Sequence, residues 1–174
     1  MRATLITGLI LGTSLFSATT FADGNTSIEI LGGPMLSSAS TGNVDSDVGF
    51  TLGAKLRMKA LNIEVMPTYF GKMDSKNIGD SYLEIRSLNL GISRDFRLNS
   101  WLRGYGQLGV SYWTMDLYLI GEKRGEDNGV SPWLGLGLDY EINNFIHLYA
   151  GFRQHFDISG SDISVLTGQI GFEF

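Results

Sequence analysis

The sequence predicts an all-β protein, an eight-stranded antiparallel up-and-down transmembrane β-barrel. Three observations carry this prediction. Apolar and polar residues alternate along eight segments, the connections between segments alternate between short and long, and one side of each segment is nearly free of charge. The composition agrees, because the 174 residues include 23 glycines, nearly twice the roughly 7% average, and 11% aromatic residues.

Composition also excludes several classes of protein. The chain has no cysteine, which rules out disulfides, thiolate metal sites and a cysteine nucleophile. Its formal net charge of -5 leaves no basic stripe to neutralise phosphates, so we expect no nucleic-acid partner. The aromatic content argues against disorder, because these side chains bury much surface.

Residues 1–22 have the layout of a cleavable secretory signal. Arg2 supplies a positive end, an apolar stretch follows, and Thr20-Phe21-Ala22 places small residues three and one before a cut at Asp23. An N-terminal membrane anchor is the alternative, but the apolar run is short, contains glycines and lacks a far positive flank. We therefore expect an exported mature domain spanning residues 23–174, and the absence of cysteine at the junction excludes a lipoprotein.

Two-residue periodicity defines the expected strands, because successive side chains of a strand point to opposite faces. In residues 164–174, for example, Leu166, Ile170 and Phe172 share one parity, while Thr167 and Gln169 share the other. The eight expected strands are Thr26–Leu36, Val48–Lys59, Leu61–Met73, Tyr82–Phe96, Trp101–Met115, Val130–Ile142, Phe145–Asp157 and Ile163–Phe174.

The connections differ at the two ends of the expected barrel. Those at residues 59–61, 97–100 and 143–144 are short. The others are mostly longer and rich in Ser, Gly, Asn and Asp, which favours loops: Ser37–Asp47, Asp74–Ser81, Asp116–Gly129 and Ile158–Asp162. Short turns at one end and long loops at the other are typical of an up-and-down membrane barrel, and an even strand number closes the sheet without an edge.

Side-chain polarity distinguishes this fold from a secreted soluble barrel or sandwich, which would place its apolar parity inside. Charges concentrate on the polar parity, where they can pair in a lumen, and the other parity is nearly charge-free, as a lipid-facing band requires. Strand four is the exception: we expect Glu84 and Arg86 to lie above the membrane and Arg94 to reach the inner interface. The lumenal set is Glu29, Lys55, Arg57, Glu64, Asp95, Arg103, Asp139, Glu141, Arg153 and Glu173.

Aromatic residues lie toward both ends of the expected strands, as interfacial girdles do. Trp101, Tyr140, Phe145, Phe172 and Phe174 lie toward the short turns, and Phe50, Tyr69, Tyr112 and Phe156 toward the long loops.

Two motifs that suggest ligand chemistry have structural explanations. Residues 104–109 match the dinucleotide fingerprint G-x-G-x-x-G, but that motif needs a following helix and here lies within a strand. His147 and His155 share the inward parity, and a metal site would need further converging ligands. We expect both histidines to join a lumenal hydrogen-bond network, with no metal and no cofactor.

Several runs resemble the OmpA-like transmembrane-domain family over most of the mature chain. Residues 129–142, beginning Gly-Val-Ser-Pro, resemble its sixth strand; residues 105–109, leading to Trp113, resemble its fifth; residues 63–65, with 71–73, resemble its third. The terminal Gly171-Phe172-Glu173-Phe174 resembles the aromatic-ended signal read by the barrel-assembly machinery. Since the chain stops at Phe174, we expect no periplasmic peptidoglycan-binding domain, and in this respect it is also similar to the barrel-only Ail/OmpX group.

The resemblance also bears on conduction. In the family, two interior acids exchange basic partners to gate a small conductance, and those acids match Glu64 and Asp139. The matching basic positions fall at Gly91 and Tyr149, so the gate is not carried over intact. We expect instead that Arg153 or Arg103 pairs with Asp139, and Lys55 or Arg57 with Glu64. Eight strands enclose an interior that side chains fill, so we expect a plugged barrel with at most small conductance.

The leading functional hypothesis is a non-enzymatic barrel in the outer membrane of a Gram-negative bacterium. It would support envelope integrity, present surface loops, contact outer-membrane lipid and lipopolysaccharide, and depend on the barrel-assembly machinery, with Phe172 and Phe174 as its assembly signal. The alternative is an adhesin of the Ail/OmpX kind that binds an extracellular partner through Asp116–Gly129, where Tyr118, Lys123 and Arg124 are candidate contacts.

A lipid A-modifying enzyme is the third hypothesis. A deacylase of that type would need a serine beside a histidine at the outer rim, with an acid nearby. His155, Asp157, Ser159, Ser161 and Asp162 cluster there in sequence, but the inward parity of His155 argues against the pairing.

Overall fold

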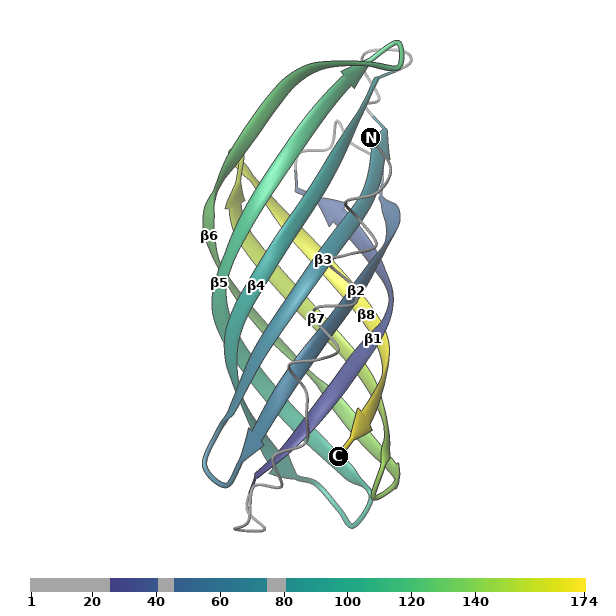
Figure 1. The fold of residues 1–174 in the computed structure, drawn as a ribbon, viewed down its shortest axis with the longest axis vertical. Coiled ribbons are helices and arrows are strands. Elements are labelled where there is room, and N and C mark those ends of the chain that lie inside the picture. Colours follow the sequence, from purple (N-terminus) through teal and green to yellow (C-terminus); the bar gives the residue numbers. More distant parts are fainter. Residues whose placement is uncertain (1–25, 41–45, 75–80) are drawn as a thin grey trace, which may run out of the picture.

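The computed structural model describes residues 26–40, 46–74 and 81–174, which form a closed barrel in the strand order β1 to β8 (Figure 1). Neighbouring strands are antiparallel throughout, and β1 pairs with β8. The predicted eight-stranded up-and-down barrel is therefore confirmed. The strands are β1 (Thr26–Ala39), β2 (Asp47–Met58), β3 (Asn62–Asp74), β4 (Ser81–Arg97), β5 (Leu102–Leu119), β6 (Glu122–Asn143), β7 (Ile146–Ile158) and β8 (Ser161–Glu173).

The predicted division of faces also holds. Large apolar side chains of one parity point outward and are exposed, such as Leu136 on β6 and Leu166 on β8, while their neighbours face the lumen. Such an apolar outer surface suits contact with the hydrocarbon core of a bilayer. Within the described ranges, the chain has no helix of the length and apolar character needed to cross a membrane. The expected signal segment, residues 1–22, and the cut before Asp23 lie outside the described residues.

Asparagine side chains order two of the short turns. The Asn99 Oδ1 accepts hydrogen bonds from the backbone nitrogens of Trp101 (2.9 Å) and Leu102 (2.8 Å). The Asn143 Oδ1 likewise accepts from Phe145 (2.8 Å) and Ile146 (2.9 Å). These Asx turns satisfy backbone donors where the sheet reverses, which is why asparagine suits both positions.

The prediction of a long polar loop over Asp116–Gly129 is wrong. β5 continues to Leu119 and β6 starts at Glu122, so most of the segment is a strand hairpin that rises above the rest of the described chain (Figure 1). Ile120 and Gly121 form its tip with φ of 53° and 76°. Positive φ at both central residues is the geometry of the two-residue hairpin turn that matches strand twist.

The connection predicted at Ile158–Asp162 is also shorter than expected, because β7 ends at Ile158 and β8 starts at Ser161. Only Ser159 and Gly160 turn the chain, again with positive φ (50° and 78°). For the expected loop Ser37–Asp47, β1 extends to Ala39 and β2 begins at Asp47, and residues 41–45 lie outside the described part. In Asp74–Ser81, residues 75–80 lie outside it as well.

The lumen is filled differently in its two halves. Toward the short turns its buried side chains are largely polar or charged, including Glu29, Lys55 and Asp139. Toward the long-loop end it holds an apolar cluster, which was not anticipated because the lumenal parity was interpreted as polar. This outer cluster comprises Met35, Phe70, Met73, Ile85, Trp113, Ile158, Ile163 and Val165, with Leu83 and Met115 packed against it.

Candidate functional site: the lumenal charge network

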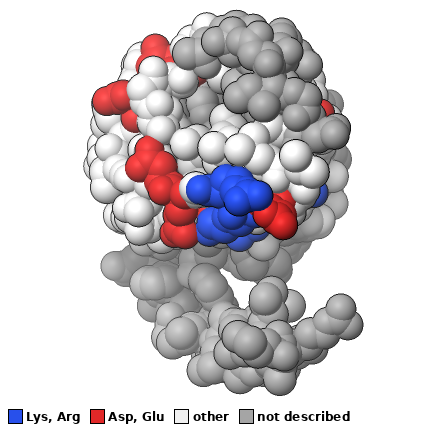
Figure 2. Space-filling model, turned by 90° about the horizontal axis from the view of Figure 1, so that it is seen from above, with Lys and Arg blue, Asp and Glu red and all other residues white. Residues whose placement is uncertain are grey.

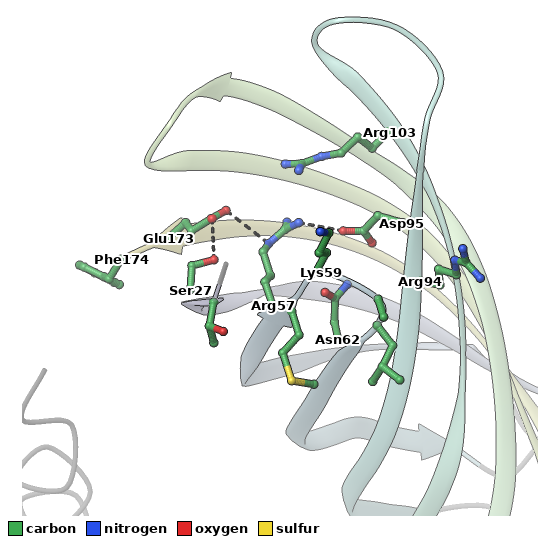
Figure 3. Close-up of a pocket in the computed structure, with 13 residues that line it drawn as sticks. Ser27, Arg57, Lys59, Asn62, Arg94, Asp95, Arg103, Glu173 and Phe174 are labelled. Atoms are coloured by element: carbon green, nitrogen blue, oxygen red, sulfur yellow. Dashed lines mark hydrogen bonds and ion pairs between the residues drawn. The ribbon is translucent and has the colours of Figure 1, made fainter. Parts of the chain in front are cut away.

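Arg57 on β2 is the centre of the lumenal charges. Its side chain lies within ion-pairing distance of four carboxylates from four other strands: Nε–Glu29 Oε2 3.0 Å, Nη1–Asp95 Oδ2 2.8 Å, Nη2–Asp139 Oδ2 3.0 Å and Nε–Glu173 Oε2 3.3 Å. Figure 3 shows the guanidinium reaching from β2 toward Asp95 on one side and Glu173 on the other. A single cation thus connects β2 to β1, β4, β6 and β8.

Asp139 on β6 is shared by three basic side chains. Besides Arg57, it lies 3.2 Å from Arg103 Nε and 3.0 Å from His147 Nδ1. His147 Nε2 in turn lies 3.1 Å from Glu173 Oε2, and Arg103 Nη2 lies 3.4 Å from Glu141 Oε2. A buried carboxylate needs such partners, because an unpaired charge in the interior costs several kcal/mol.

Tyr149 on β7 connects the network further. Its hydroxyl donates to Glu29 Oε1 at 2.5 Å and accepts a hydrogen bond from Arg57 Nη2. In register, Tyr149 lies directly opposite Asp139. Tyr149 occupies a position that, by the resemblance noted in the sequence, is basic in the family. Here a phenol at that position forms hydrogen bonds within the Arg57 cluster instead.

A second group of charges lies next to the Arg57 cluster, at the neighbouring inward-facing position of β2. Lys55 Nζ lies 3.4 Å from Glu64 Oε1, and these residues are cross-strand partners of β2 and β3. The Ser93 hydroxyl donates to the same oxygen of Glu64 at 2.5 Å. The Lys55 ammonium also lies over the rings of Tyr149 (4.6 Å) and Tyr105 (5.4 Å), where the π faces attract it.

Arg153 on β7 is buried without a direct carboxylate partner among the described residues. It donates to Met66 Sδ at 3.1 Å and lies 5.4 Å above the Trp133 ring. With the Gln107 amide oriented to satisfy both neighbours, its nitrogen donates to Glu64 Oε2 (2.9 Å) and its oxygen accepts from Arg153 Nε (3.0 Å). Gln107 is therefore a neutral bridge between an acid and a base.

Both pairs expected from the sequence are present, Glu64 with Lys55 and Asp139 with Arg103. Of the two other candidate bases, Arg57 also joins Asp139, and Arg153 joins neither acid directly. Sequence reasoning missed Tyr149 and Gln107 as connecting groups, whereas the expectation that His147 joins the lumenal hydrogen-bond network is confirmed. Parity placed His147 in the lumen, but its carboxylate partners depend on how far side chains reach across the barrel.

Gly91 shows why the second family position has no basic group. It lies opposite Glu64 in register, and the Trp133 ring packs against it so closely that a Cβ there would approach the ring to 2.5 Å. A basic side chain at this position would have to displace the indole. The lumen is therefore closed beside Glu64 by an aromatic ring rather than by an ion pair.

The lumen opens at the short-turn end in a polar recess of about 640 Å³. Arg57, Arg103, Glu173 and Phe174 form part of its wall (Figure 3). Water can fill this recess up to the Arg57 cluster, where paired charges occupy the interior. The geometry supports a hydrated vestibule that ends at a plug.

The candidate contacts of the β5–β6 hairpin are themselves paired. Lys123 Nζ lies 2.7 Å from both Asp116 Oδ1 and Glu126 Oε2, and these hydrogen bonds raise its pKa above the ordinary lysine value. Arg124 pairs with Glu122 at 2.6 Å. Tyr118 stacks on Tyr82 with ring centroids 4.7 Å apart. Figure 2 views this end from above, with Lys and Arg gathered beside acidic side chains on an otherwise mostly uncharged surface.

The remaining motifs fall where parity predicts. The glycines at 104, 106 and 109 lie inside β5, with no helix after them. His155 is buried between the rings of Phe70 and Trp133, and its Nδ1 has no hydrogen-bond partner in the described part of the chain. The expectation that it joins the lumenal hydrogen-bond network is therefore wrong, because aromatic rings surround it. The Ser159 hydroxyl donates to Asp127 Oδ2 at 2.6 Å and not to a histidine. Asp162 Oδ1 accepts a hydrogen bond from the backbone N–H of Asp157 at 3.1 Å. Among residues 26–40, 46–74 and 81–174, no three His, Asp or Glu side chains form a group that could hold a metal.

Solved barrels from other bacteria share this fold. Neisserial surface protein A is 17% identical with a TM-score of 0.64, and 86% of this chain and 97% of that chain are covered. The attachment invasion locus protein Ail of Yersinia pestis is 18% identical with a TM-score of 0.62, covering 86% and 99%. The outer membrane protein OprG of Pseudomonas aeruginosa is 17% identical with a TM-score of 0.65, covering 86% and 96%.

At the sequence level, comparison with curated proteins gives no match. The family model described as the OmpA-like transmembrane domain matches residues 3–165, which is nearly the whole chain. The resemblance noted in the sequence is thus confirmed, and the chain belongs to the OmpA-like transmembrane domain family of bacterial outer-membrane barrels.

Proposed function

We propose that this protein is a non-enzymatic barrel of a Gram-negative outer membrane that supports envelope integrity and presents its outer hairpin to the exterior. The observation that carries the proposal is the Arg57 cluster, in which one guanidinium joins carboxylates of four strands inside the lumen. Such a cluster strengthens the barrel from within and obstructs its passage. A closed barrel of this type serves as a membrane anchor and scaffold, with at most small and rare conductance.

Two successive barriers support the closed state. An ion entering from the short-turn vestibule meets the Arg57 cluster first and then the second layer around Lys55 and Glu64. Beyond these, the apolar cluster around Phe70 and Trp113 offers no groups that could replace the ion's hydration shell. Opening the polar layers alone would leave the outer half closed.

Planar-bilayer recording combined with fractionation tests the proposal. We expect the protein in the outer-membrane fraction, migrating differently on gels before and after heating, and we expect minor current flicker. Deletion of the gene should increase sensitivity to detergents that the outer membrane excludes. Large steady currents, a soluble periplasmic protein, or an unaltered envelope would each contradict the corresponding part of the proposal.

Assembly is proposed to depend on the barrel-assembly machinery, with Phe172 and Phe174 in the recognised signal. Both rings lie on the exposed outer side of the last strand. Phe174 also closes the barrel, because its backbone exchanges hydrogen bonds with Ile28 at 2.8 and 3.2 Å. Deleting Phe174 should lower the yield of heat-modifiable barrel more than truncating residues 116–129 does. Equal yields from the two variants would contradict this ranking.

An adhesin is the second candidate, and the β6 edge favours it. β6 pairs with β5 from Glu122 onward, but its pairing with β7 begins only at Trp133. Residues 122–132 therefore present a strand edge with no strand partner among the described residues, next to the tip residue Ile120, which is 81% exposed. An exposed edge can accept an added strand from another protein.

Whole-cell binding with a shortened hairpin separates the two candidates. A variant that lacks residues 118–123 keeps the barrel but loses the tip, so an adhesin would lose most of its binding to host cells or matrix. A matched variant with asparagine at Asp162 changes the neighbouring β7–β8 turn, keeps an oxygen that can accept from Asp157, and leaves the contacts of residues 122–132 untouched, so it should bind normally. Unchanged binding after shortening would eliminate the adhesin candidate and leave the scaffold role.

A further inference from the structure

The outer surface of the barrel carries charged residues where its parity is otherwise apolar. Lys72 on β3 and Glu84 and Arg86 on β4 point outward near the long-loop end. Lys72 lies opposite Glu84 in the sheet, and Arg86 lies opposite Tyr69. The sequence alone placed Glu84 and Arg86 above the membrane but gave these side chains no role.

These three side chains are arranged so that positive charge is presented outward. Glu84 Oε1 lies 3.6 Å from Lys72 Nζ and Glu84 Oε2 lies 3.0 Å from Arg86 Nη2. The carboxylate side chain is only 11% exposed, whereas those of Lys72 and Arg86 are 57% and 60% exposed. The covered acid lies beneath both cations and offsets part of their charge, and most of the guanidinium donors remain free for a further anion.

An apolar groove continues from the cations toward the middle of the barrel. It is an open recess of about 560 Å³ whose wall includes Phe50, Leu52, Pro67, Tyr69 and Arg86. Pro67 has no backbone N–H, and the β2–β3 ladder lacks paired residues between Thr51–Thr68 and Ala54–Val65. The interrupted ladder thus coincides with the hollow on the lipid-facing surface.

Polarity changes from row to row along this surface. Lys72 and Glu84 form the first outward-facing row, Arg86 shares the next row with the rings of Tyr69 and Phe50, and Leu88 and Pro67 follow with Leu52 on the neighbouring strand. A molecule that matches the series has an anionic head, an interfacial region and acyl chains, in that order. Arginine favours phosphate in particular, because its planar fork of donors fits phosphate oxygens.

We propose that Lys72, Arg86 and the groove around Pro67 bind one phosphorylated glycolipid of the outer leaflet, the lipid A part of lipopolysaccharide. The proposal rests on the proposed outer-membrane location, which places the long-loop end at the outer leaflet. One lipid A phosphate lies against Arg86 and Lys72, and an acyl chain lies along Leu52 and Pro67. The bound lipid is part of the barrel's outer surface rather than a substrate.

Native mass spectrometry of the full-length mature barrel in detergent tests this site with three probes: bisphosphorylated lipid A, the same lipid A without phosphates, and phosphatidylglycerol. We expect wild type to retain bisphosphorylated lipid A about tenfold better than K72Q/R86Q does, a difference typical of losing charge-assisted hydrogen bonds. Removing the phosphates from the lipid should cause a similar loss. Equal retention by wild type and K72Q/R86Q would overturn the site.

The matched control is K123Q/R124Q, which removes the same two charge types from the hairpin above the groove and should retain lipid A as wild type does. E84Q removes the acid and leaves both cations, so it should increase retention several-fold, which a purely structural role for these residues would not produce. A decrease with E84Q in a folded barrel would contradict the charge argument. Heat-modifiable migration verifies the fold of each variant.

Phosphatidylglycerol distinguishes the source of the phosphate. If it competes with lipid A at equal concentration, the groove is a general site for anionic lipid and the assignment to lipid A is wrong. Binding is measured on purified protein, so its failure is distinct from failure of the proposed function, which fractionation and bilayer currents report. A barrel absent from the outer membrane would overturn the proposed function even if lipid A bound in detergent.

Discussion

The inner and outer halves of the lumen close the same barrel by different physical means. Around Arg57, closure depends on ion pairs and hydrogen bonds in which each group has specific partners at fixed distances. Around Phe70 and Trp113, closure depends on apolar volume that fills the space between strands. The first arrangement is sensitive to chemistry and the second to size, so equivalent substitutions should affect them differently.

This difference also bears on what each half contributes. The charge cluster specifies which strands face one another, because misplacing β8 would leave Glu173 and Arg57 without each other. The apolar cluster should accept several packings of similar volume, because it includes two methionines, with a third packed against it, and methionine adapts to irregular spaces. We therefore expect the polar half to define register and the apolar half to add stability with less specificity.

Replacing Arg57 should give the largest effect. Arg57→Met leaves Glu29, Asp95, Asp139 and Glu173 without their shared cation, so we expect a loss of ~5 kcal/mol in the free energy of unfolding, the upper end for breaking a buried pair. Arg57→Lys should cost nearly as much, because an ammonium cannot reproduce the guanidinium fork. Urea unfolding in lipid vesicles measures both, and a mild effect of Arg57→Lys would show that charge alone suffices.

Removing Glu64 should have the next largest effect. Glu64→Ala leaves Lys55 without its ion pair and Gln107 without the acid it bridges to Arg153, and we expect destabilisation of ~3–5 kcal/mol. Because the apolar cluster still closes the outer half, planar-bilayer currents should show only minor flicker. If Glu64→Ala opened a steady pore, the outer cluster would not be an independent barrier.

In the apolar half, the loss of stability on substitution should follow the side-chain volume removed rather than the chemical identity of the side chain. Phe70→Ala should cost about 3 kcal/mol through lost burial and the remaining cavity. Phe70→Leu should cost less than about 1.5 kcal/mol, because the volume is nearly kept. The contrast with Arg57→Lys is the critical measurement, made under the same unfolding conditions. Similar costs for the two conservative variants would remove the distinction between the halves.

The smallest effect is expected outside both halves, at Lys123. Its raised pKa means that its stabilising contacts with Asp116 and Glu126 are complete below the ordinary lysine pKa and are lost only as pH rises past the folded value. Lys123→Gln should leave barrel unfolding unchanged and speed hydrogen exchange only in the hairpin, and high salt should reduce the difference from wild type. Faster exchange throughout the barrel would mean that the hairpin and lumen unfold together.

Much of the fold was predictable because the two faces of each strand differ in polarity, which makes apolar and polar residues alternate in the sequence. The alternation in residues 164–174 placed Leu166 outward and Thr167 inward, as found. The hairpin at residues 116–129 was mistaken for a loop because a strand pair in water needs no apolar face, so its polarity resembles that of a loop. Gly121, which can adopt positive φ, was the available signal for a tight turn.

The site was predictable to the level of face and partly of partner. Lys55–Glu64 follows from the hairpin register of β2 and β3, since the two residues lie opposite each other. Arg57 reaches carboxylates on four strands, which depends on the barrel's width and the length of its side chain, and neither is encoded in parity. The apolar outer lumen was missed because Ile163 and Val165 share a parity with Thr167 and Gln169, and polarity changes along that face.

The length of β6 determines which part of the protein meets the surroundings first. The strand runs six residues from Asp127, which the β7–β8 turn contacts through Ser159, to the tip at Gly121, a path of about 20 Å at the usual rise per residue. An antibody or a bacteriophage too bulky to enter a carbohydrate layer of that depth would reach Ile120 while the β7–β8 turn stayed shielded. Exposure to immune and phage selection should therefore fall on this one projection more heavily than on any other described part of the chain.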